Sequence, residues 1–130
     1  MSFLRGRMNR ANYWLSIILV ITLTVAFTAL SGKDPHVSEV VLLMLVIPRL
    51  HDIDRTGWIA VGVVAFEIAA TIGLFAWLDD EELVFQGMGF VTLAIAVLMI
   101  WLGSIPGDRY GNRYGDAPKP GIFFRKKATR

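Results

Sequence analysis

Long apolar stretches alternate with short islands of charge along this chain. Residues 12–31 and 83–105 contain no charged side chain, and residues 57–78 contain only Glu67. A hydrocarbon core about 30 Å thick is crossed by about 20 helical residues, so each stretch is long enough to span a membrane. A water-soluble domain of 130 residues has too little interior to bury three such stretches. The sequence therefore predicts an integral membrane protein.

The composition agrees with a small membrane domain. Hydrophobic residues make up 55% of the chain and charged residues 18%, whereas soluble domains carry about 25% charge. The chain has no cysteine, which excludes a disulfide scaffold and thiolate metal sites. Its length fits one domain, which we expect to cover residues 1–130.

A fourth membrane span is predicted over residues 35–54. Its apolar centre is short, but His36, Ser38 and Glu39 at one end and Arg49, His51 and Asp52 at the other can reach interfacial water. Pro35 suits a first helical turn, and Pro48 is expected to bend the last turn.

The distribution of basic residues decides between three and four spans, because Lys and Arg are retained on the cytoplasmic side. Four spans with the N-terminus inside place twelve of the thirteen basic residues in the cytoplasm and leave Lys33 outside. Three spans would leave only three inside. We therefore predict an all-α bundle of four transmembrane helices at 12–31, 35–54, 57–78 and 83–105, with both termini cytoplasmic and a basic tail over 106–130.

The N-terminus also has some features of a secretory signal peptide: a basic start, an apolar run and a small-residue site ending at Ser31. Its apolar part is slightly long for such a signal. Cleavage would also leave three spans with the basic tail outside, so we expect the segment to be retained as the first span.

Three motif-like segments lie on the predicted cytoplasmic face: FLRGRMNRANYW at 3–14, RLHDIDRTGW at 49–58 and PGDRYGNRYG at 106–115. They resemble the GRxxRxxYW, RLHDxGxSGW and PGxxGxNRYG patterns of the bacterial inner-membrane family called domain of unknown function 805. The likeness covers roughly residues 3–118. It implies a small multi-span protein of the bacterial plasma membrane and implies no activity.

The sequence departs from the family pattern at three positions of the middle segment. Asp54 replaces a usual Gly, Thr56 a usual Ser, and Ile59 a common second Trp. A role that needs a flexible glycine in that turn is therefore not expected here.

The predicted inner turn concentrates charge. It contains Arg49, His51, Asp52, Asp54 and Arg55. Adjacent His and Asp can act as a base and its orienter or as two metal ligands. However, consecutive helical residues diverge by about 100°, and His36 is predicted on the opposite side, so we expect no metal site and no cofactor. The simpler interpretation pairs Asp52 with Arg49 or Arg55 and lets Asp54 or Thr56 cap the third span.

Arginines of the other two segments complete the candidate binding set. Arg7 and Arg10, with Arg5, are either phosphate ligands at the start of the first span or anchors of the topology. Arg109 and Arg113 are expected to fold back over the inner turn and pair with Asp52 or Asp54. The set of candidate binding residues comprises Arg7, Arg10, Arg49, His51, Asp52, Arg55, Arg109 and Arg113.

Glu67 is the most costly residue in the predicted bilayer. It lies near the middle of the third span, where an acidic group costs about 2.5–3.5 kcal/mol on insertion scales. Such a residue marks a proton or ion path, or it is protonated and hydrogen-bonded to Thr22, Thr24 or Thr92. The absence of a second ionisable group at that depth favours the structural role.

Ala65, Ala69 and Gly73 repeat every four residues on the same span, a spacing that lets helix backbones approach closely. Because Glu67 projects from the opposite face, we expect the third helix to be central or the protein to pair with itself.

Three functions follow from these features. The first is a non-enzymatic module that binds anionic membrane lipids or a partner protein through the cytoplasmic Arg/His/Asp cap. The second is a small ion- or proton-coupled transporter or channel that uses Glu67, and the third is a membrane enzyme based on His51 and Asp52. No Walker loop, nucleophile elbow, HExxH helix or Rossmann fingerprint is present, so an enzyme is not expected. With a net charge of only +2 and no nucleic-acid motif, nucleic-acid binding is not expected either.

Overall fold

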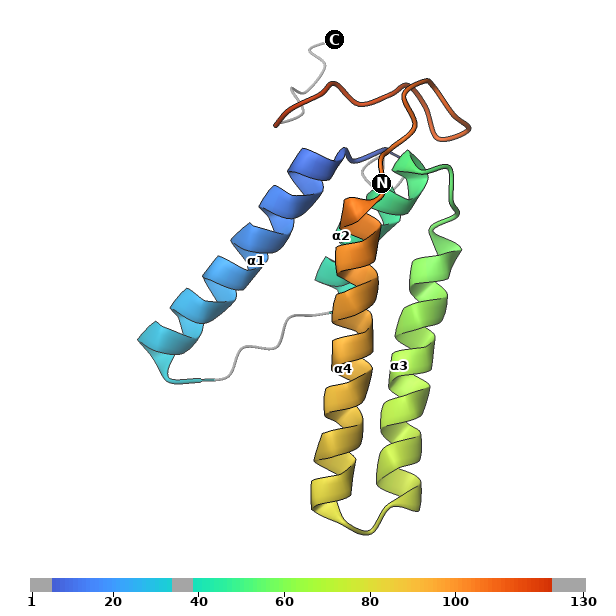
Figure 1. The fold of residues 1–130 in the computed structure, drawn as a ribbon. Helices are drawn as coiled ribbons and strands as arrows, with labels where there is room; N and C mark the ends of the chain where they lie inside the picture. Colours follow the sequence, from blue (N-terminus) through green and yellow to red (C-terminus); the bar gives the residue numbers. More distant parts are fainter. Residues whose placement is uncertain (1–5, 34–38, 123–130) are drawn as a thin grey trace.

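The computed structural model describes residues 6–33 and 39–122 and shows a helical protein (Figure 1). The described residues form four helices: α1 (Arg10–Ser31), α2 (Glu39–Asp52), α3 (Trp58–Trp77) and α4 (Glu81–Ser104). No strand occurs in these residues, only an isolated bridge between Asn112 and Gly115. The prediction of an all-α fold with four helices is confirmed.

Three of the helices are long and apolar enough to cross a membrane: α1, α3 and α4. α2 has 14 residues, which cover about 21 Å at 1.5 Å per residue. It accounts for positions 39–52 of the predicted 35–54 span, and residues 35–38 of that prediction lie outside the described part. The chain is therefore an integral membrane protein by the length and composition of its helices.

Two hydrogen bonds in the last turn of α2 explain why this helix stops before residue 54. The amide of Arg55 donates to the carbonyl of Leu50, and the amide of Asp54 donates to that of His51. These are the two hydrogen bonds of a Schellman motif, which places the residue at the C′ position in the left-handed region. Asp54 occupies that position with φ +55°, a conformation that Asp tolerates better than most residues and that glycine adopts freely. The departure from the family pattern at Asp54 thus changes the residue at this turn while the turn itself forms.

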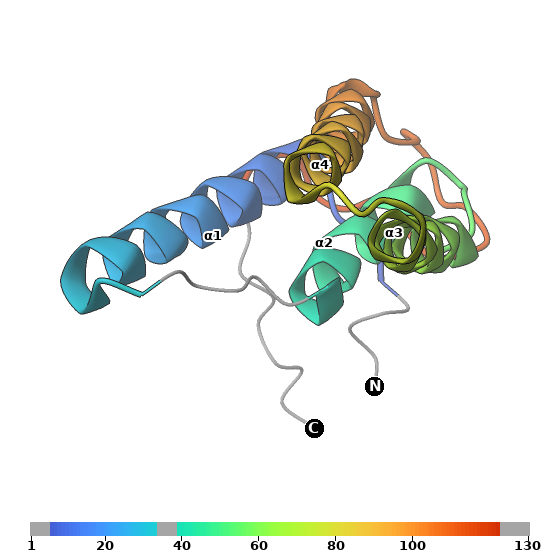
Figure 2. The same cartoon turned by 90° about the horizontal axis from the view of Figure 1, so that it is seen from below.

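Two of the helices form an antiparallel hairpin beside α2. α3 and α4 are joined by residues 78–80, and Asp80 caps α4 by accepting a hydrogen bond from the amide of Glu82. α2 contacts both of them, while α1 contacts α2 and α4 and slants away from the hairpin toward its own C-terminal end (Figures 1 and 2). The start of α1, the end of α2, the start of α3 and the end of α4 therefore lie at the same end of the molecule.

The buried core lies beneath that end. It comprises Tyr13, Leu50, Ala60 and Leu102, one residue from each helix. Tyr13 is fully buried, and its hydroxyl donates to the carbonyl of Met99 at 3.0 Å. The neighbouring Trp14 indole donates to the carbonyl of Gly103 at 3.2 Å. Because these two donors reach the last turns of α4, the start of α1 is attached to the end of α4.

Gly103 permits this attachment, and its replacement should loosen it. A Cβ at Gly103 would lie 2.7 Å from the Trp14 ring and 2.8 Å from that of Tyr13. We predict that Gly103→Ala lowers the free energy of unfolding by about 1–3 kcal/mol, the usual cost of overpacking, measured by thermal unfolding in mild detergent. Gly89→Ala is the matched control. Gly89 lies on the same helix, and a Cβ there would meet no atom within 4 Å. Equal stability of the two variants would contradict the attachment.

Candidate functional site

The three motif segments come together at one end of the bundle. We call this surface the motif face and define it as residues 6–10, 48–57 and 105–122. Main-chain hydrogen bonds join the three segments directly: the amide of Met8 donates to the carbonyl of Pro48 at 2.9 Å, and the amide of Asp108 donates to that of Asp52 at 2.8 Å. The prediction that the motifs share one surface is therefore met in the structure.

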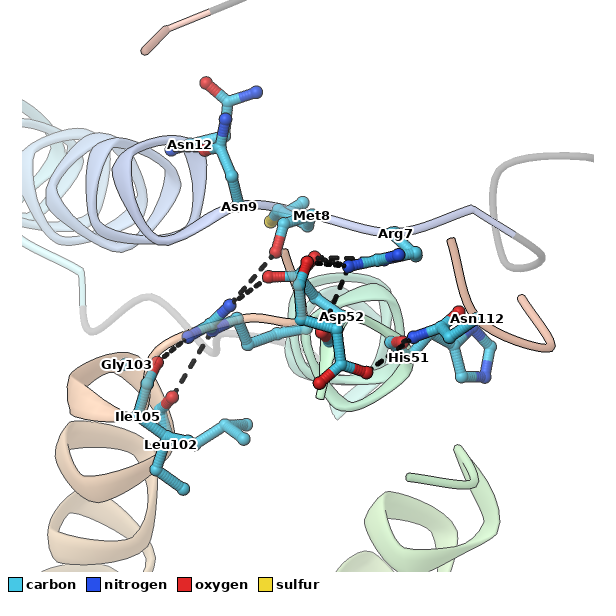
Figure 3. Close-up of polar contacts among 12 residues, drawn as sticks. Arg7, Met8, Asn9, Asn12, His51, Asp52, Leu102, Gly103, Ile105 and Asn112 are labelled. Carbon is cyan, nitrogen blue, oxygen red and sulfur yellow. Dashed lines mark hydrogen bonds and ion pairs between the residues drawn. The ribbon is translucent and has the colours of Figure 1, made fainter. Parts of the chain in front are cut away.

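The carboxylate of Asp52 is held by two arginines from different segments. Nε of Arg7 donates to Oδ1 at 3.1 Å, and Nη1 of Arg49 donates to Oδ2 at 2.5 Å. Arg49 is fully buried, and the side chain of Arg7 is only 1% exposed. We call Arg7, Arg49 and Asp52 the arginine–aspartate cluster. Figure 3 shows Asp52 at its centre, with Arg7 and Met8 beside it.

Arg49 also binds the C-terminal end of α4. Its Nε donates to the carbonyl of Leu102 at 3.3 Å, and its Nη2 donates to that of Ile105. The last carbonyls of a helix lack partners within the helix and carry partial negative charge, so a buried guanidinium is favourable there. Arg49 thus connects the carboxylate of α2 to the end of α4.

Arg7 binds the loop that follows α4. Its Nη2 donates to the carbonyl of Asp108 at 2.6 Å, and its Nη1 donates to those of Tyr110 at 2.7 Å and Gly115 at 3.2 Å. One side chain from the N-terminal arm therefore holds three points of a loop about 100 residues away in the sequence.

The close approach of this loop to the cluster requires glycine at position 107. A Cβ built on Gly107 would overlap Oδ2 of Asp52. The glycine therefore makes room for a carboxylate of the cluster.

His51 is separated from the cluster although it precedes Asp52. Its ring stacks on Tyr114 with centroids 3.8 Å apart and an angle of 9°, and its Nδ1 lies 3.3 Å from the carbonyl oxygen of Gly6. Since the side chains of His51 and Asp52 contact different partners, the structure does not form a base–orienter pair from these two residues. Among residues 6–33 and 39–122, no three His, Asp or Glu side chains are grouped as a metal site requires.

Burial shifts the pKa values of His51 and Asp52. These two residues end α2 and lie outside the three span-length helices. Burial lowers the pKa of His51, opposed by its hydrogen bond to Gly6. Burial raises the pKa of Asp52, and the charges of Arg49 and Arg7 act in the opposite direction. The desolvation of Asp52 makes its two ion pairs essential, because a buried charge without partners is strongly unfavourable.

Two asparagines that sequence reasoning missed also hold the motif face together. Nδ2 of Asn9 donates to the carbonyls of Lys119 and Gly121, both at 2.8 Å. Nδ2 of Asn112 donates to the carbonyl of His51 at 2.9 Å and to Oδ2 of Asp108 at 3.0 Å. Their partners are mostly main-chain groups, so the only signal in the sequence is their place inside the motif segments.

The remaining candidate arginines are exposed on the motif face. Arg113 forms an ion pair with Asp54, with Nε 3.0 Å from Oδ1, so the predicted pairing of these two residues is present. Within the described ranges Arg109 pairs with neither Asp52 nor Asp54. Arg10, Arg55 and Arg109 are all exposed.

Glu67 lies apart from the motif face, in the wall of an apolar cavity between α2, α3 and α4. The predicted hydrogen bonds to Thr22, Thr24 or Thr92 do not form among the described residues. The Thr22 hydroxyl instead donates to the carbonyl of Ile18, within its own helix.

Comparison with known proteins identifies the family. Residues 2–116 match the family described as "Protein of unknown function (DUF805)", so the chain belongs to that family. No curated protein and no solved structure matches the chain.

The two aspartates of the motif face should differ sharply in their contribution to stability. We predict that Asp52→Asn lowers the free energy of unfolding by about 3–5 kcal/mol, because it leaves two buried guanidinium groups without a counter-charge. Asp54→Asn is the matched control: its ion pair with Arg113 has side chains 60% and 49% exposed, and such pairs contribute about 1 kcal/mol or less. Unfolding in detergent measures both, and a similar loss in the two variants would contradict the role of the cluster.

Proposed function

We propose that this DUF805 member is a non-enzymatic module of the bacterial inner membrane that binds anionic lipid headgroups through the exposed basic rim of its motif face. The rim consists of Arg10, Arg55, Arg109 and Lys119. The observation that carries the proposal is the division of the basic residues into a buried set that contacts Asp52 and this exposed set on the same face.

The buried arginines, Arg7 and Arg49, do not form a binding site for a headgroup themselves. The guanidinium groups of Arg7 and Arg49 already contact the carboxylate of Asp52 and several carbonyls. A headgroup phosphate would have to displace these contacts. The exposed arginines have no such constraint, and a guanidinium fork matches phosphate geometry.

The charge at the two ends of the bundle supports the orientation. The opposite end contains Asp79, Asp80, Glu81 and Glu82, next to the turn between α3 and α4. Basic residues concentrate on the cytoplasmic side of membrane proteins. We therefore place the motif face in the cytoplasm, at the level of the anionic leaflet.

A cleft beside the start of α1 supplies space for a headgroup. It measures about 330 Å³ and lies between Arg10 and the loop residues Gly107 and Pro118. The N-terminus of a helix carries partial positive charge, which adds to the attraction of Arg10 for an anion. Two carboxylates also line the cleft: Asp52 is paired with Arg7 and Arg49, and Asp108 accepts a hydrogen bond from Asn112.

Removing the rim charges should reduce the preference for anionic lipid. Each basic residue near an anionic surface contributes about 1 kcal/mol, or about fivefold in affinity. We predict that the combined variant Arg10→Ala, Arg55→Ala, Arg109→Ala retains at least tenfold less phosphatidylglycerol than wild type, relative to phosphatidylcholine. Native mass spectrometry of protein released from mixed-lipid nanodiscs measures the retained lipid.

Lys33→Ala is the control, because it removes a basic residue next to the far end of α1. It should leave the lipid preference unchanged. An unchanged preference in the triple variant would contradict lipid binding by the rim, and copurification of a protein that is lost only in the triple variant would point to a protein partner instead.

A further inference from the structure

An apolar cavity opens between three helices below the motif face. It has a volume of about 120 Å³ and is lined by side chains of α2, α3 and α4, including Leu43, Val46, Val63, Leu98 and Trp101. Leu50, Ala60 and Leu102 of the buried core form its end nearest the motif face. Its walls contain one charged residue, Glu67.

Glu67 has no counter-charge in the part of the chain that the structure describes. No cation pairs with it and no group there donates a hydrogen bond to it. Every fully buried side-chain nitrogen or oxygen in the described residues has a partner, so the unpartnered carboxyl of Glu67 is not fully buried. The cavity therefore combines an apolar lining with one acidic residue in its wall.

The depth of Glu67 limits which groups can reach it. It is the tenth of the twenty residues of α3, about 13 Å from Trp58 along the helix axis. Lipid amines lie at the headgroup level and do not reach this depth. A cationic partner of Glu67 must therefore be lipophilic enough to enter the hydrocarbon region.

We propose that this cavity binds a small lipophilic organic cation, with its ammonium group against Glu67 and its hydrocarbon part among the aliphatic side chains. The volume is somewhat below that of an apolar cavity of about 150 Å³ that holds benzene, so the cavity admits one aromatic ring at most, and the rest of the cation lies in its opening. This site is independent of the basic rim, which attracts anions on the motif face above the cavity. Either proposal can fail without the other.

The test uses two probes of the same shape, benzyltrimethylammonium and its uncharged analogue neopentylbenzene. Trp101 lines the cavity, so quenching of tryptophan fluorescence and calorimetry in neutral detergent report binding. We expect wild-type protein to bind the cation at least tenfold more tightly than the neutral analogue. In Glu67→Gln, which keeps the side-chain size, the cation should lose at least tenfold in affinity while neopentylbenzene is unaffected.

Two further variants separate the cavity from other sources of binding. Glu81→Gln neutralises an exposed acid at the start of α4 and should leave both affinities at the wild-type level. Val63→Phe fills the cavity from α3 and should weaken both probes. Equal binding of the two probes to wild type, unchanged cation binding in Glu67→Gln, or an equal loss in Glu81→Gln would each overturn the proposal.

Discussion

The carboxylate of Asp52 is the point at which the separate parts of this small membrane protein are joined. It forms ion pairs with Arg7 from the N-terminal arm and with Arg49 from its own helix, and these arginines in turn bind the loop after α4 and the end of α4. Because α1 slants away from the other helices beyond this end, the ion pairs and hydrogen bonds here fix its attachment to them. In a membrane protein, helix association has little hydrophobic driving force, which gives such polar contacts greater weight.

This arrangement divides the polar residues by role. The arginine–aspartate cluster is closed by internal contacts, while the basic rim around it is exposed and faces the same direction. Below them, the helices leave an apolar cavity with a single acid, Glu67. The two proposed sites therefore differ in depth, in the sign of their charge and in the ligands they suit: anionic headgroups at the rim and a lipophilic cation in the cavity.

Local rules predicted most of the helices and part of the motif face. The apolar stretches indicated α1, α3 and α4. In the structure α4 begins two residues before the predicted span, because Asp80 caps it and Glu81 and Glu82 are favourable in a first turn. The pairing of Arg113 with Asp54 follows from complementary charges on two motifs. The pairing of Asp52 with Arg49 follows from helical spacing.

The remaining contacts were beyond sequence reasoning for a physical reason. Asn9 and Asn112 bind main-chain carbonyls, which every residue possesses, so no complementary residue type marks the partner. Arg7 and Arg10 look equivalent in the sequence, but only Arg7 reaches Asp52, because α1 begins at Arg10 and carries that side chain to the exposed rim. The φ of +55° at Asp54 explains why glycine suits that position, which the pattern alone does not explain.

The most direct test of the central claim is a double-mutant cycle between the N-terminal arm and α2. The free energy of unfolding in detergent is measured for wild type, Arg7→Gln, Asp52→Asn and the double variant. If the two residues form one buried pair, the double variant loses less than the sum of the single losses, with a coupling of about 1 kcal/mol or more. Losses that simply add would show that Arg7 and Asp52 act independently and would contradict the account.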